Sequence, residues 1–109
     1  MAFSESLATR IRDALARKTN IEEKKMFGGV GFLLNGNMLV GVWKDSIIVR
    51  LGHDRYDDAL VEPHVREFDI TGKPMKGWIM VESEGVKDDD QLHDWIGRAT
   101  TFVKTLPKK

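Results

Sequence analysis

The sequence predicts an α+β domain in which one antiparallel sheet is covered by two amphipathic helices. Apolar residues recur with helical spacing near both ends of the chain, at 4–15 and 88–106. Between them, residues 26–82 form short apolar and β-branched runs separated by turn signals. Each helix needs an apolar sheet face against which to bury its stripe, so the two patterns fit a single domain over residues 1–109.

The first predicted helix begins after Ser4, a residue type that caps helix N-termini well. Its apolar face is formed by Leu7, Ala8, Ile11, Ala14 and Leu15. Asn20 and the charged run at 22–25 then predict a connection to the sheet.

Three strands are predicted next, at 26–34, 38–43 and 47–51. The dipeptide Asn35-Gly36 separates the first two, and it is the strongest short signal for a hairpin. A type I′ turn needs positive φ at both central residues, which asparagine and glycine tolerate. These strands predict a three-stranded antiparallel meander.

The middle of the chain predicts a short helix at 54–60, ended by Pro63, and then strands at 66–70 and 75–82. The last strand alternates, with Trp78 and Met80 on one face and Ile79 and Val81 on the other. A turn at 71–74 joins the two strands.

The final helix carries the clearest pattern. Asp88 and Gln91 fit a capping box, and Pro107 ends the helix. Its apolar stripe consists of Leu92, Trp95, Ile96, Ala99, Val103 and Leu106. The predicted order is therefore α-β-β-β-α-β-β-α.

Composition excludes several function classes. The 17 basic and 17 acidic residues give no net charge, whereas dedicated nucleic-acid binders usually carry a basic excess. The chain has no cysteine, which excludes disulfides, thiolate metal sites and cysteine nucleophiles. The first residues do not read as a signal peptide and no apolar run is long enough to span a bilayer, so we expect a cytoplasmic protein.

Several motifs resemble the N-terminal domain of the TfoX family of competence regulators. The run Lys25-Met26-Phe27-Gly28-Gly29, followed by Gly31 and the turn at 35–36, is similar to the opening motif of that domain. The predicted strand ending at 49–51 is similar to the family's third strand, which ends in a basic residue. The run at 72–75 and the late helix with Leu92 and Trp95 continue the resemblance, which covers about residues 5–106. The family tends to carry an aromatic residue where this chain has Val30.

The resemblance implies an α+β fold related to secretion-chaperone-like and YjbR-like domains, in the element order given above. It also implies a regulatory function. Full-length members regulate DNA uptake in bacteria and carry a second, C-terminal domain that has no counterpart in these 109 residues.

The glycine-rich strand and Arg50 are the candidate interaction or ligand residues, namely Phe27, Gly28, Gly29, Gly31 and Arg50. The glycines do not fit a dinucleotide or Walker motif, because the chain enters a hairpin instead of a helix. We interpret them as a bulged strand or as backbone approached closely by a tryptophan or a helix, with a ligand resting on bare backbone as the alternative. Arg50 stands in an apolar strand and therefore either faces solvent, pairs with a carboxylate or receives an anion.

No catalytic constellation stands out. His53, His64 and His93 lack metal-ligand spacing, and the aspartates after His53 do not match a calcium loop. No serine lies in a nucleophile elbow. The acidic run at 82–94 is typical of a solvated helix start, although it would also attract a basic partner. We therefore predict no enzyme, no cofactor and no metal.

These observations favour a regulatory or protein-interaction domain that binds a protein partner or forms a homodimer through its edge strands. One alternative is a small-molecule or anion-binding protein, or a minor enzyme, that uses the glycine-rich strand and Arg50. A second is a DNA-associated accessory protein that uses the mildly basic N-terminal third. Its basic residues include Arg10, Arg17, Lys18, Lys24 and Lys25.

Overall fold

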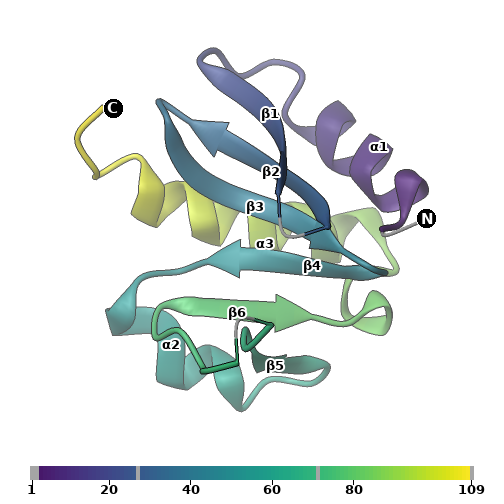
Figure 1. Ribbon diagram of the computed structural model, residues 1–109, viewed down its shortest axis with the longest axis vertical. Coiled ribbons are helices and arrows are strands. Elements are labelled where there is room, and N and C mark those ends of the chain that lie inside the picture. The colour runs from purple at the N-terminus through teal and green to yellow at the C-terminus, as the bar shows by residue number, and fades with distance from the viewer. Residues whose placement is uncertain (1–2, 27, 71, 109) are drawn as a thin grey trace.

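A computed structural model describes residues 3–26, 28–70 and 72–108 of the chain. Its helices in these ranges are α1 (Glu5–Ala14), α2 (His53–Leu60), α3 (Asp89–Val103) and the short 3₁₀ helix η1 (Ser83–Val86). Its strands are β1 (Ile21–Met26), β2 (Gly29–Leu34), β3 (Asn37–Trp43), β4 (Ser46–Arg50), β5 (Val65–Glu67) and β6 (Trp78–Val81). The predicted α+β class is confirmed (Figure 1). In this described part of the chain, no helix has the length and apolar character needed to cross a membrane.

The strands form one antiparallel sheet in the order β1-β2-β3-β4-β6-β5. The chain meanders from β1 to β4 and then passes through α2 to β5 at the far edge. It returns as β6, which fills the position between β4 and β5 (Figure 1). β1 and β5 are therefore the two edges of the sheet.

β1 corrects the predicted connection at 22–25. These residues form a strand that pairs with β2, with Glu22 opposite Leu33 and Lys24 opposite Gly31. The sequence pattern does not predict this strand, because charged side chains point to both of its faces. An edge strand can pair through its backbone without alternating apolar residues. The meander consequently has four strands, and Ile21 packs against the core.

The Asn35-Gly36 turn is as predicted. Both residues have positive φ, 54° for Asn35 and 82° for Gly36, as a type I′ turn requires. The turn pairs Leu34 directly with Asn37. The register shifts between Phe32 and Leu33, and β3 therefore contributes two consecutive residues, Leu39 and Val40, to the core.

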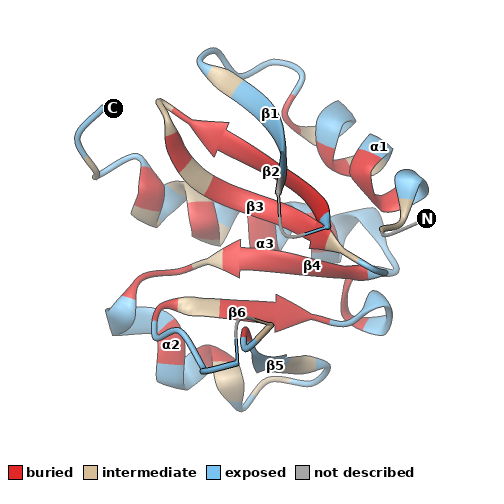
Figure 2. Cartoon of the chain, in the orientation of Figure 1, coloured by how far each residue is buried: buried red, intermediate tan, exposed pale blue. Residues whose placement is uncertain are grey.

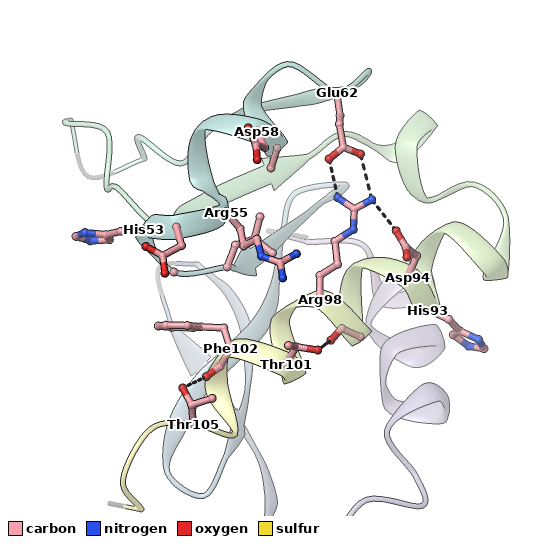
Figure 3. Close-up of a pocket in the computed structure, with 15 residues that line it drawn as sticks. His53, Arg55, Asp58, Glu62, His93, Asp94, Arg98, Thr101, Phe102 and Thr105 are labelled. Carbon is pink, nitrogen blue, oxygen red and sulfur yellow. Dashed lines mark hydrogen bonds and ion pairs between the residues drawn. The ribbon is translucent and has the colours of Figure 1, made fainter.

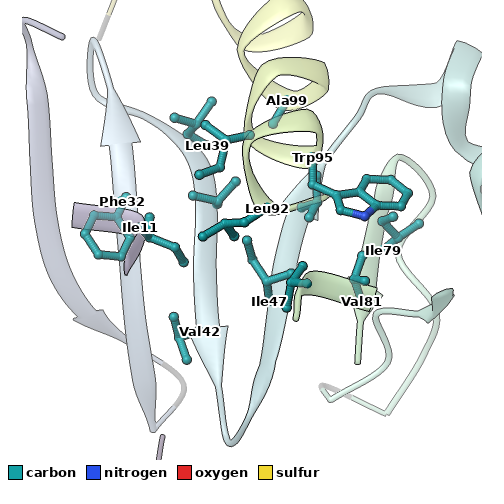
Figure 4. Packing of buried hydrophobic residues seen from close by; sticks show 14 of the residues in the cluster. Ile11, Phe32, Leu39, Val42, Ile47, Ile79, Val81, Leu92, Trp95 and Ala99 are labelled. Carbon is teal, nitrogen blue, oxygen red and sulfur yellow. The ribbon is translucent and has the colours of Figure 1, made fainter. Parts of the chain in front are cut away.

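The large core lies on the sheet face that the helices cover (Figures 2 and 4). α1 contributes Ile11, and the predicted stripe of α3 is buried from Leu92 to Val103. Both predicted N-caps form: Ser4 Oγ accepts a hydrogen bond from the Leu7 amide at 3.1 Å, and Gln91 Oε1 accepts one from the Asp88 amide at 3.0 Å.

The opposite face of the sheet, called here the outer face, carries a smaller cluster of Ile48, Phe68 and Met80. Trp78 packs against this cluster, with its ring centroid 5.9 Å from that of Phe68. The alternation predicted for β6 is confirmed. The strand predicted at 66–70 ends earlier, at Glu67, because Phe68 leaves the sheet edge to cover the outer face.

Candidate functional site

The glycines singled out in the sequence serve the packing of β2. A Cβ on Gly29 would overlap the carbonyl oxygen of Val42, so the close approach comes from the backbone of β3 and not from a tryptophan or a helix. Gly31 lies inside the strand, opposite Gly41 of β3. Gly28 is exposed and precedes the strand with φ of 77°. Phe27, the remaining candidate of this motif, lies outside the described residues.

Arg50 is the last residue of β4 and its side chain is half-buried. Its guanidinium carbon lies 5.0 Å from the ring centroid of Trp78 and 5.7 Å from that of Phe102. Nη1 donates a long hydrogen bond of 3.4 Å to the carbonyl oxygen of Met38. Within the described ranges, no carboxylate forms an ion pair with Arg50. Burial lowers the pKa of Arg50 below its ordinary value.

The sheet positions this arginine by dividing at the end of β4. Pairing between β3 and β4 extends only to Val40 and Val49, while Asn37 and Met38 pair with β2 alone. The two strands diverge there in Figure 1, and α3 passes behind them. Arg50 reaches across this division to the Met38 carbonyl. The sheet order also places β3 between Arg50 and the glycine-rich β2, so the predicted candidates do not form one site.

A groove of about 1070 Å³ lies between α2 and α3 (Figure 3). We call it the α2–α3 groove, and its lining includes Asp54, Arg55, Asp58, Gly97, Thr101 and Phe102. Arg55 points into the space between the helices, whereas His53 and His93 point away from it. Among the described residues, no three His, Asp or Glu side chains are grouped closely enough to hold a metal ion.

Arg98 closes one side of this groove through two carboxylates. Its Nη1 lies 2.6 Å from Glu62 Oε2 and its Nη2 lies 2.9 Å from Asp94 Oδ2. The guanidinium also stacks on Trp95, at 4.2 Å from the ring centroid. The hydrogen bonds with Glu62, followed by the charge of Asp94, raise the pKa of Arg98. Arg98 thus joins the end of α2 to α3, and its charge is compensated within the fold.

Two basic residues of the N-terminal third are also engaged within the fold. Arg10 binds Asp89 at 3.1 Å, and Arg12 binds Glu23 at 2.7 Å. α1 ends at Ala14, so Arg17 and Lys18 lie beyond the helix that carries Arg10. The DNA-facing surface expected from these residues is therefore smaller than the sequence indicates.

Sequence reasoning missed Arg98 and Phe102. The spacing of Asp94 and Arg98 is a readable i, i+4 pair on a helix. Glu62 precedes Arg98 by 36 residues, so its contact requires the tertiary fold. Phe102 sits between the α3 core stripe and Arg50, and no local pattern marks that position.

No curated protein and no solved structure matches the chain. The TfoX N-terminal domain model matches residues 13–103, which is most of the chain and includes β1 through α3. The chain therefore belongs to the TfoX N-terminal domain family.

Proposed function

We propose that this domain is a regulatory, protein-interaction module that acts in the cytoplasm of bacteria, and that it forms a homodimer through β1. The observation that supports the dimer is the edge position of β1, where no other strand of the described chain pairs with one side of its backbone. Its six residues span about 20 Å of edge, enough for a second strand to pair. We propose no catalytic step.

The charges of β1 are self-complementary in one antiparallel register. Ile21 packs on the core and Glu23 binds Arg12 of α1, so alternation places Glu22 and Lys24 on the outer face. A two-fold axis normal to the sheet at Glu23 would set Glu22 opposite Lys24 of the second copy, twice. Opposite charges directly across two strands favour pairing. The two Glu23 side chains meet at the axis, where each is already bound by Arg12.

Charge reversal tests this dimer. We expect Glu22→Lys alone and Lys24→Glu alone to be monomeric, because each places like charges across the axis twice. An equimolar mixture of the two variants restores both opposite-charge pairs and should form a heterodimer. Sedimentation velocity from micromolar to millimolar concentration measures all three samples.

The matched control is Glu84→Lys on η1, an exposed charge reversal that follows β6 and is not part of the β1 edge, which should leave association unchanged. Circular dichroism checks that each variant is folded. A wild-type chain that stays monomeric at millimolar concentration would overturn the dimer and would mean that the β1 charges protect the edge from pairing.

A direct role on DNA has less support. Arg10 and Arg12 are bound by carboxylates of the chain itself, which leaves fewer cations for phosphate contacts. A DNA-binding role predicts a mobility shift of duplex DNA that weakens steeply with salt, because phosphate contacts release counterions. Absence of a shift at low salt would remove this alternative.

A further inference from the structure

Arg50 differs from the other half-buried arginines of the described chain. Arg10, Arg50 and Arg98 are all half-buried, and two of them bind a carboxylate. Arg50 does not. The exposed arginines without ion pairs, such as Arg55, are solvated by water and need no partner. Arg50 therefore holds a partly desolvated charge that nothing in the described fold neutralises.

The guanidinium also keeps most of its hydrogen-bonding capacity. An arginine has five N–H donors, and with the described residues Arg50 makes one long bond of 3.4 Å, to the Met38 carbonyl. The rings of Trp78 and Phe102 contact the cation but accept no strong hydrogen bond from it. A planar fork with free donors, held by aromatic side chains, matches the geometry of a carboxylate.

We infer that Arg50 is the centre of a carboxylate-binding site at the division between β3 and β4, which takes a monocarboxylate carried on an apolar group. The single positive charge of Arg50 is matched by a ligand with a single negative charge. The surroundings of Arg50 are apolar and accessible, since Trp78, Phe102 and Met38 are half-exposed, and Trp78 packs against the Phe68 cluster. The carboxylate of the ligand would thus bind the guanidinium of Arg50 while its apolar group packs against the neighbouring Trp78 ring.

The site is separate from both β1 and the α2–α3 groove. Arg50 lies on β4, three positions from β1 in the sheet order, and only Phe102 is shared with the groove lining. A dimer through β1 would therefore leave Arg50 open, and the carboxylate site stands independently of the proposed dimer.

Phenylacetate is the probe we would titrate first, against ¹⁵N-labelled wild-type protein at constant ionic strength. We expect the Arg50 Nε–H and Trp78 indole resonances to shift as the phenylacetate concentration rises and to reach a plateau. Phenylacetamide, which has the same ring and no charge, should bind at least about tenfold more weakly, because the charge-assisted hydrogen bonds are lost. Inorganic phosphate should bind more weakly than phenylacetate, since it has no apolar body to bury.

Arg50→Met should abolish these shifts at Trp78, whereas Arg17→Met, which removes an exposed arginine, should leave them unchanged.

Two sources can supply the carboxylate, a free small acid or the C-terminus of a peptide ending in an apolar residue. A peptide acid compared with its C-terminal amide distinguishes them: tight binding of the peptide acid alone identifies a peptide terminus. Unshifted Arg50 resonances in wild-type protein at millimolar phenylacetate, or equal affinity for phenylacetate and phenylacetamide, would overturn the site. Both of these results are measured on the wild-type protein, so neither requires that a variant folds.

Discussion

Arg50 and Arg98 occupy two regions that resemble each other in their aromatic contacts and differ in their charges. Each guanidinium stacks on a tryptophan, Arg98 on Trp95 at 4.2 Å and Arg50 on Trp78 at 5.0 Å. Arg98 has two carboxylates within 2.9 Å, whereas Arg50 has none among the described residues. Their pKa values accordingly move in opposite directions, upward for Arg98 and downward for Arg50. Stacking on an aromatic ring therefore does not distinguish a structural arginine from a binding arginine, but the carboxylate partners do.

Phe102 connects the two regions. It lines the α2–α3 groove beside Arg98, and its ring also faces the guanidinium of Arg50. The ring packs directly over Gly52, at the entry to α2. A change that displaces this ring should thus disturb Arg50 while leaving the ion pairs of Arg98 in place.

Gly52→Ala should strongly destabilise the domain. Gly52 has φ of 82°, and a Cβ there would lie 2.5 Å from Phe102 Cδ1. We expect a loss of about 2–3 kcal/mol in the free energy of unfolding, from backbone strain together with displacement of the ring. Denaturation by urea measures it.

Gly72→Ala is the matched control for this prediction. Gly72 has φ of 99°, but a Cβ there would meet nothing within 4 Å. Its loss should reflect backbone strain alone, about 1 kcal/mol. Equal losses at the two positions would contradict the assigned role of Phe102.

Glu62→Gln should have an intermediate effect. Glu62 makes two hydrogen bonds with Arg98, but their side chains are 35% and 36% exposed, so solvent screens the pair. We expect a loss of about 1 kcal/mol, and a smaller one for Asp94→Asn, whose side chain is 58% exposed. A double-mutant cycle of Glu62→Gln with Arg98→Met isolates the pair. A larger loss of stability for Asp94→Asn than for Glu62→Gln would contradict the assignment of Glu62 as the stronger partner of Arg98.

The sequence predicts some parts of this molecule much better than others, for physical reasons. The α3 stripe and the Asn35-Gly36 turn follow from local periodicity and local backbone preference, and both are confirmed. β1 cannot be predicted in this way, since its charged residues form a strand only by pairing with the backbone of β2. Arg50 could be singled out as a charge in an apolar strand. Its contacts with Phe102 and Met38 depend on where β3 and β4 diverge, which no local pattern encodes.

Gly97→Ala should have the smallest effect, and of opposite sign. Gly97 lies inside α3 and faces the α2–α3 groove, and a Cβ there would meet nothing within 4 Å. Unlike Gly52, it supports no ring and needs no unusual backbone, so alanine should stabilise the domain by about 0.5–1 kcal/mol through its better helix propensity. Thermal unfolding followed by circular dichroism measures the gain. Gly85→Ala, whose Cβ would lie 2.5 Å from Val81 Cγ1, should destabilise and provides the contrast. A loss of stability at Gly97 would mean that α3 is tightly constrained at Gly97 as well as at Phe102.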